Sequence, residues 1–132
     1  MNYEVFDRVF NSLKERLESD ENIVIKVYSK PTGSVYPLVV IKRIDYRQLT
    51  RAYPTSVVSI EVDIFAKEAM MTGKRTSNEN VARHIECIVS EHMMELGLIL
   101  RSSVPTPHVD STIHRITMRF DGTIDDFRSR IY

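Results

Sequence analysis

Apolar residues recur along this chain with two different periods, which predict helices in two places and strands in five. Val5, Val9, Leu13 and Leu17 follow one another at helical spacing, with charged residues between them. Residues 56–66 instead alternate between apolar and mostly polar positions, which is typical of a strand with one polar face. Over the whole sequence these patterns predict, in chain order, a helix over 2–19, strands over 23–28, 35–44 and 56–66, a helix over 78–96, a strand that opens at 98–100, and a strand over 112–121.

The order of these elements, α-β-β-β-α-β-β, predicts an α+β fold in a single domain. Successive strands with short links favour a mostly antiparallel sheet, and we expect both helices to pack on one face of it. The other face, with Glu61, Asp63, Arg115 and Arg119, would then lie uncovered. The remaining segments are interpreted as loops over 45–55 and 67–77, a stiff proline-containing connection over 104–108, and a charged C-terminal extension over 122–132 that follows a domain spanning 1–121.

The second predicted helix carries recognisable signals at both ends. Ser77 or Asn78 can cap its first turn, because a short polar side chain accepts a hydrogen bond from a free backbone N–H. Gly97 follows the last apolar position, Leu96, where glycine commonly ends a helix. We therefore expect this helix to begin next to Ser77 and to end before Gly97.

Composition narrows the class of protein. The chain has 132 residues, 42% hydrophobic and 27% charged, which suits one globular domain and excludes a disordered or collagen-like chain. Lys+Arg and Asp+Glu number 18 each, and this balance argues against a general binder of DNA or of membrane surfaces. One cysteine excludes an intramolecular disulfide. Residues 1–10 lack the apolar core of a secretory signal, and the longest apolar stretch is too short to cross a bilayer, so we expect a cytoplasmic protein with no membrane segment.

Candidate chemistry is sparse. His84, Cys87 and His92 lie on the second predicted helix, but their spacing matches no standard zinc signature, and we interpret His92 as a hydrogen-bonded core or interface residue. Glu61 and Asp63 share one strand face, as carboxylates of metal-dependent nucleases do, yet no further acidic residue accompanies them. We interpret that face as directed to solvent or to another subunit. With no glycine-rich phosphate loop and no nucleophile elbow, we expect no metal, no cofactor and no enzymatic activity.

The charges are separated along the chain although they cancel in total. Residues 42–51 are basic, the second predicted helix is acidic, and the 67–77 segment carries further lysine and arginine. In a ring of identical subunits, a basic loop can meet the acidic helix of a neighbour. Met70 and Met71 in the 67–77 segment also suit a contact surface, since exposed methionine adapts to many partners. This distribution favours an assembly protein.

One sequence pattern resembles a known family. Residues 36–40 (YPLVV) are followed by a basic and aromatic loop, by the strand SVVSIEVDIF over 56–65, and by Gly73-Lys74 ahead of the second helix. This succession resembles the tail terminator or tail completion proteins of long-tailed bacteriophages, and the resemblance spans 1–121. The chain departs from the family in the arginine-rich 45–55 loop and in the residues after 121.

The resemblance implies a structural virion protein of the phage tail and neck, assembled in the cytoplasm of the bacterial host. Family members form a hexameric ring on the last ring of the tail tube, stop its polymerisation and offer a docking surface to the head or neck connector. The implied partners are further copies of the chain, the tail tube protein and the connector, and DNA passes through the lumen without specific binding. Our candidate interface residues, taken from the two loops and their flanks, are Arg43, Arg47, Arg51, Tyr53, Met70, Met71, Lys74 and Arg75.

Three alternatives stay open at this point. A head-completion or head–tail joining protein would also act in the neck, but it would bind the connector rather than the tube. A small metal-dependent nuclease is the enzymatic alternative, with Asp63 as its candidate carboxylate. A monomeric binding module is the third.

Overall fold

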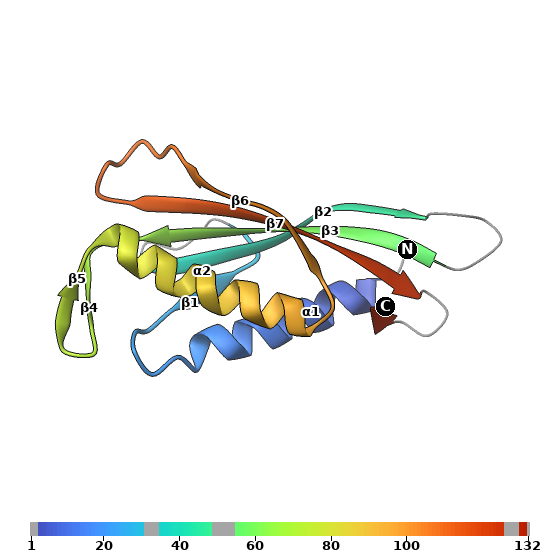
Figure 1. Cartoon of the computed structure of the whole chain (residues 1–132), viewed down its shortest axis with the longest axis horizontal. Coiled ribbons are helices and arrows are strands. Elements are labelled where there is room, and N and C mark those ends of the chain that lie inside the picture. The colour runs from blue at the N-terminus through green and yellow to red at the C-terminus, as the bar shows by residue number, and fades with distance from the viewer. Residues whose placement is uncertain (1–2, 31–34, 49–54, 126–129, 132) are drawn as a thin grey trace.

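The computed structural model of the chain describes residues 3–30, 35–48, 55–125 and 130–131 (Figure 1). Two helices and eight strands lie within these ranges. In chain order they are α1 (Tyr3–Glu18), β1 (Lys26–Tyr28), β2 (Leu38–Gln48), β3 (Thr55–Ala66), β4 (Ala69–Met71), β5 (Lys74–Thr76), α2 (Asn78–Glu95), β6 (Ile99–Thr106), β7 (His114–Asp125) and β8 (Arg130–Ile131).

The strands form one mixed sheet and one separate hairpin. Within the described residues the sheet has the order β1-β2-β3-β7-β6, with β8 also paired to β7, while β4 and β5 pair only with each other. The β1–β2 pair is parallel and the other pairs are antiparallel. A mostly antiparallel sheet with two helices confirms the predicted α+β class. The order of elements differs from the prediction, because the described chain has more strands than the five expected.

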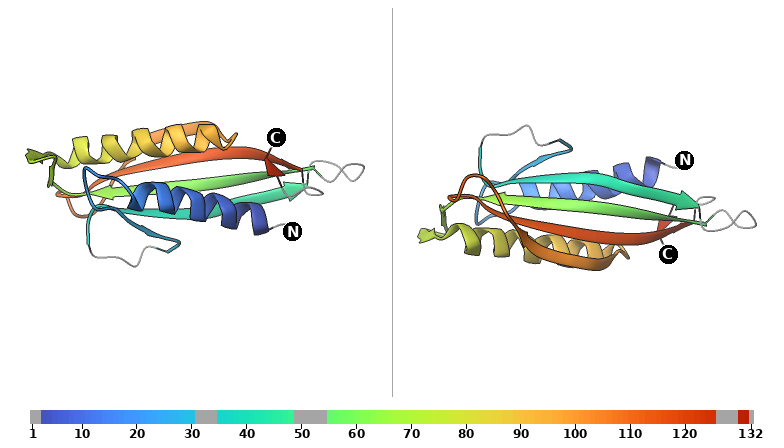
Figure 2. Two further views of the ribbon diagram at one scale, coloured as in Figure 1. Left: turned by 90° about the horizontal axis from the view of Figure 1, so that it is seen from below. Right: turned by 90° about the horizontal axis from the view of Figure 1, so that it is seen from above.

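Both helices lie on the same face of the sheet. The left view of Figure 2 shows them in front of the sheet, and the right view shows the sheet in front of them. The stripe of α1, including Val9 and Leu13, is buried against inward-facing residues of the central strands such as Ile60 and Phe120. The core therefore lies between the helices and the sheet, and neither helix covers the opposite face, which we call the open face.

Local sequence signals set the limits of α2. The Ser77 Oγ accepts a hydrogen bond from the backbone N–H of Asn80 at 3.3 Å, which caps the first turn as predicted. At the other end, Gly97 has φ +91°, a left-handed conformation that a residue with a Cβ adopts at a cost. The N–H of Gly97 bonds Met94 O, and the N–H of Leu98 bonds Met93 O, each at 3.0 Å. This pairing is a Schellman motif, and it confirms the predicted end of the helix.

The two segments interpreted as loops contain strands. β2 continues to Gln48 and β3 begins at Thr55, so every described residue of 45–55 belongs to a strand, and 49–54 lies outside the described residues. A register shift between Arg43 and Asp45 interrupts the alternation of apolar and polar residues, so the sequence pattern did not predict that β2 continues beyond this point. The 67–77 segment contains the β4–β5 hairpin, whose turn residues Thr72 and Gly73 both have positive φ, as a type I′ turn requires.

The C-terminal part of the sheet is also longer than predicted. β6 runs through Pro105 to Thr106, which an edge strand permits because the missing N–H of proline faces outward. β7 continues past residue 121 to Asp125, and Ile124 pairs with Ile131 of β8. Residues 122–125 and 130–131 are therefore sheet residues, although the sequence placed them in a charged extension. The buried side chain of Ile124 accounts for this continuation.

Candidate functional site

The open face carries a cluster of five charged side chains from three adjacent strands. We call it the charged cluster, and it consists of Lys42 on β2, Glu61 and Asp63 on β3, and Arg115 and Arg119 on β7. The register places Glu61 opposite both Lys42 and Arg119, so these three side chains share one face of the sheet. The strand alternation predicted this placement for the four members on β3 and β7, and the register confirms it.

Each carboxylate of the charged cluster is held by several cations or hydroxyls. The Lys42 Nζ lies 3.1 Å from Glu61 Oε2 and 3.7 Å from Asp63 Oδ2. Arg119 Nη2 lies 3.5 Å from Glu61 Oε1. Asp63 Oδ1 accepts hydrogen bonds from Arg115 Nε at 3.2 Å and from the Thr117 hydroxyl at 2.6 Å. Side chains of β2 and β7, the strands on either side of β3, therefore bind both acids.

The two acids are buried although no helix covers their face. Asp63 is 2% exposed and Glu61 is 8% exposed. The longer side chains of Lys42, Arg115 and Arg119 stay partly in solvent, with 43%, 28% and 57% of their side-chain surface exposed. They cover the carboxylates with their aliphatic stems and charged heads. We interpreted this face as directed to solvent or to another subunit, and neither helix covers it. The two acids themselves are buried, however, because the neighbouring strands supply side chains that shield them.

The bonded polar surface continues along β7. The Ser59 hydroxyl donates to Asp121 Oδ1 at 2.7 Å, and Arg101 Nε donates to Asp121 Oδ2 at 2.9 Å. A shallow groove of about 440 Å³ runs beside the charged cluster, lined by Glu61, Ser102, Val104, Thr106, Arg115, Thr117 and Arg119. Among the described residues, every buried side-chain nitrogen and oxygen has a hydrogen-bond partner. This arrangement supports a fixed polar surface.

The histidines and the cysteine on α2 lie apart from one another in their contacts. His84 Nε2 lies 3.0 Å from Asp20 Oδ2, and His92 Nε2 lies 2.8 Å from the Ser12 hydroxyl of α1. The second contact confirms the interpretation of His92 as a hydrogen-bonded residue at a helix interface. Cys87 is exposed. In the described ranges, no group of three or more His, Cys, Asp and Glu side chains is placed to hold a metal ion.

His92 gives a prediction for the pH dependence of stability. Burial lowers the pKa of His92 below 6.5, while the Glu95 carboxylate opposes this shift and Arg16 adds to it. The unfolded chain therefore binds this proton more readily than the folded chain. The contribution of neutral His92 is fully present above the unfolded pKa of about 6.5 and is lost as the pH falls through the folded pKa. We expect urea unfolding of the wild type to weaken more between ~pH 7.5 and ~pH 5.5 than that of His92→Gln. Equal weakening in both proteins would contradict this role.

The candidate interface residues fall into two separate groups. Arg47 lies on β2 near the end where this strand leads into 49–54, and Arg43 lies near the middle of the same strand (Figure 1). Arg51 and Tyr53 lie outside the described residues. The other four, Met70, Met71, Lys74 and Arg75, lie on the β4–β5 hairpin at the far end. The fold does not bring the two groups together, so they would make separate contacts.

The members of the hairpin group differ in exposure. Met70 is 56% exposed, whereas Met71 packs against the core and is only partly accessible. Lys74 and Arg75 are exposed, and Arg75 Nε lies 2.5 Å from Glu68 Oε1. Met70 and Lys74 are therefore the hairpin residues most available to a partner, while Met71 anchors the hairpin to its own domain.

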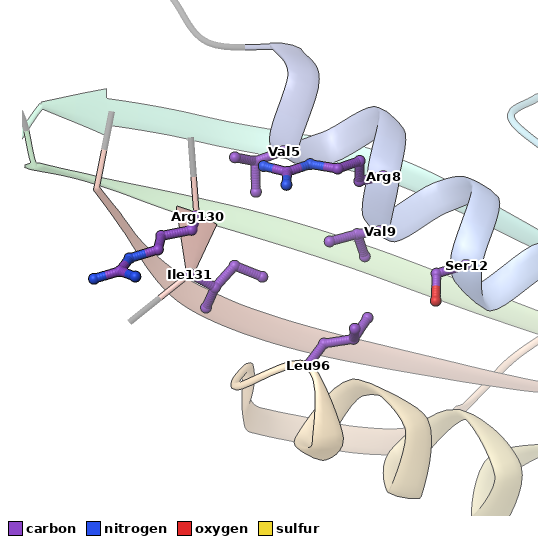
Figure 3. A pocket seen from close by; sticks show the side chains of 7 residues that line it. All are labelled: Val5, Arg8, Val9, Ser12, Leu96, Arg130 and Ile131. Carbon is purple, nitrogen blue, oxygen red and sulfur yellow. The ribbon is translucent and has the colours of Figure 1, made fainter. Parts of the chain in front are cut away.

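A hollow of about 250 Å³ lies where α1, the end of α2 and β8 meet, and sequence reasoning did not find it. Its lining residues are Val5, Arg8, Val9, Ser12, Leu96, Arg130 and Ile131. Figure 3 shows Val9, Leu96 and Ile131 pointing toward one another across the hollow, while Arg130 points away from it. α1, the end of α2 and β8 are far apart in the chain. The hollow could not be predicted because it depends on the pairing of β8 with β7, which the sequence did not predict.

The comparisons with known proteins give no family for this chain. No protein-family model matches it, and no curated protein sequence is significantly similar to it. Neither described helix is long and apolar enough to cross a membrane.

Proposed function

We propose that this chain is a structural protein of a long-tailed bacteriophage that forms a ring on the tail tube, ends its polymerisation and provides the docking surface for the neck connector. The proposal starts from the resemblance of residues 1–121 to tail terminator proteins. The observation that carries it further is the separation of two candidate contact regions. The exposed Arg47 lies near the end of β2 at one end of the domain, and the β4–β5 hairpin lies at the other (Figure 1). A ring subunit needs such separate surfaces for its neighbours and for the rings above and below.

The open face also suits a subunit that surrounds DNA. A lining with many unpaired cations would bind the phosphate backbone through counterion release and impede its passage. Here the cations of the charged cluster are held by Glu61 and Asp63, and Arg101 is held by Asp121. This face offers little unpaired positive charge to a passing duplex.

The same contacts weigh against the nuclease alternative. A nuclease would use Asp63 and a nearby carboxylate to coordinate a divalent ion. In this chain Arg115 and the Thr117 hydroxyl bind Asp63 Oδ1, and the Lys42 ammonium lies 3.7 Å from Oδ2, so both carboxylate oxygens already have partners. The acids are therefore better explained as part of a structural network.

The decisive experiment is electron microscopy of phage particles made without this protein. We expect tails of irregular and excessive length that do not join capsids, with both defects corrected when the wild-type chain is supplied in trans. A pull-down against purified tube protein and purified connector separates a tail terminator from a head-completion or joining protein, which would bind only the connector. Tails of normal length that join capsids in the absence of the chain would refute the proposal.

A further inference from the structure

The β4–β5 hairpin forms an arm that extends beyond the N-terminal end of α2 (Figure 1). We use "the arm" for residues Ala69–Thr76. Ala69 at the base of the arm and Met71 next to its turn pack against the core, while Met70 on the other side of the strand is 56% exposed. A two-stranded hairpin is marginally stable in water by itself. An exposed methionine on such an arm therefore suggests that another surface covers the methionine.

The arm presents one positive charge that the domain does not neutralise. Arg75 is paired with Glu68, whereas the Lys74 ammonium has no ion pair within the described part of the chain. The turn residues Thr72 and Gly73 hold a defined type I′ conformation next to Lys74. The arm thus offers an apolar group and a free ammonium in a fixed arrangement.

A complementary surface lies on the exposed side of α2. Cys87, Glu91 and Met94 are spaced by four and three residues, so they share one face of the helix, and Glu95 adjoins them. We call these four residues the acidic face. Met94 is 62% exposed, and Glu91 and Glu95 are exposed as well, with Glu95 close enough to His92 to act on its pKa. The acidic face therefore combines an exposed methionine with two exposed carboxylates.

The arm cannot reach the acidic face of its own chain. The arm adjoins the N-terminal end of α2, while Glu91, Met94 and Glu95 lie in the last turns of that helix (Figure 1). With 18 residues, α2 is about 27 Å long, which separates the two surfaces. Only another copy can bring them together, and such a head-to-tail contact closes into a ring or continues as a filament.

We propose that the arm of one copy docks on the acidic face of the next, with Met70 against Met94 and with Lys74 between Glu91 and Glu95. The contact matches apolar with apolar and cation with anion. The apolar hollow between α1 and β8 does not suit the arm, because Arg8 and Arg130 at that site carry the same charge as Lys74. The inference rests on the proposed ring and specifies the contact between its subunits.

Cys87 allows a direct test, because it is the single cysteine of the chain and lies in the acidic face. Met70→Cys adds a second cysteine on the arm, and Val109→Cys adds one at a fully exposed position between β6 and β7, in neither the arm nor the acidic face. Cys87 lies seven residues, or about 10 Å, along α2 from Met94, which is too far for a disulfide with a residue seated on Met94. We therefore expect a bismaleimide of about that span to link Met70→Cys into a ladder of multimers several-fold faster than Val109→Cys. Circular dichroism of both variants checks that they remain folded.

Charge reversal provides a second test, in which sedimentation velocity measures the self-association of the full chain. Lys74→Glu and the double variant Glu91→Lys/Glu95→Lys should each weaken self-association about two- to fivefold per ion pair lost, and their combination should restore it. Lys26→Glu, which reverses an exposed charge on β1 at the sheet edge opposite β6, should have no such effect. Equal cross-linking of Met70→Cys and Val109→Cys, in a monomer or in an oligomer, overturns the arm contact. The tail-length experiment decides the proposed function separately, because a ring built through another surface would still end tails.

Discussion

Asp63→Ala is expected to lower the free energy of unfolding by about 3 kcal/mol, the lower part of the range for breaking a buried ion pair. Asp63 is 2% exposed and holds Lys42, Arg115 and the Thr117 hydroxyl. Removing the carboxylate leaves these groups without their shared acceptor. The loss should not reach the upper part of the range, because the side chains of Lys42 and Arg115 are 43% and 28% exposed and can turn toward water.

The measurement is urea unfolding at neutral pH, with the slope compared between variants to confirm that the same transition is observed. Glu68→Ala is the matched control. Its pair with Arg75 is exposed, with 54% and 75% of the two side-chain surfaces accessible, and such pairs contribute about 0–1 kcal/mol. Asp63→Asn should fall between the two, because its amide oxygen can still accept from Thr117. A loss below about 1 kcal/mol in Asp63→Ala would contradict the buried network.

Asp63 also separates two readings of the open face. In the structural reading, Asp63→Ala is destabilised and the wild type shows no DNA cleavage with Mg²⁺ or Mn²⁺. In the nuclease reading, the wild type cleaves DNA in the presence of the metal and Asp63→Ala abolishes cleavage. The two interpretations therefore predict different DNA cleavage by the wild type, and this test does not depend on the stability of any variant.

Helix limits were predictable because local chemistry decides them. Ser77 caps α2 through its own hydroxyl, and Gly97 ends it through a left-handed backbone, both within a few residues of the helix. The face of each charged residue on β3 and β7 was predictable for a similar reason, since side chains alternate along a strand. These features need no knowledge of distant parts of the chain.

Strand ends and burial on the open face depend on distant partners instead. β2 continues beyond the register shift after Arg43 because β3 supplies the hydrogen bonds, and the local sequence beyond that shift lacks alternation. Asp63 is buried because Lys42 comes from β2 and Arg115 from β7. The hollow beside β8 arises from a pairing of β8 with Ile124 and Asp125. None of these long-range relations leaves a periodic signal in one sequence.

Gly122 shows how a contact between distant parts of the chain restricts a single position to glycine. The sequence placed this glycine in an extension, but β7 carries it into the sheet opposite Val58. A Cβ on Gly122 would lie 2.3 Å from Leu98 Cδ2, far inside contact distance. Leu98 is 3% exposed and its N–H belongs to the Schellman motif that ends α2, so its side chain has little room to move. We expect Gly122→Ala to lower the free energy of unfolding by about 2–3 kcal/mol, as overpacking of a core does.

A double-mutant cycle with Leu98→Ala tests this cause. Leu98→Ala alone should cost about 2–5 kcal/mol, because it leaves a cavity at the end of α2. In Gly122→Ala/Leu98→Ala the new methyl group enters the vacated space, so the double variant should be more stable than the sum of the single effects by about 1–2 kcal/mol. Gly73→Ala is the control, since its φ of +78° makes it costly while no atom lies within 4 Å of the added Cβ. Its effect should add to that of Leu98→Ala without coupling. If Gly122→Ala were equally additive, its cost would come from the backbone, and the close approach of β7 to the end of α2 would not explain the glycine.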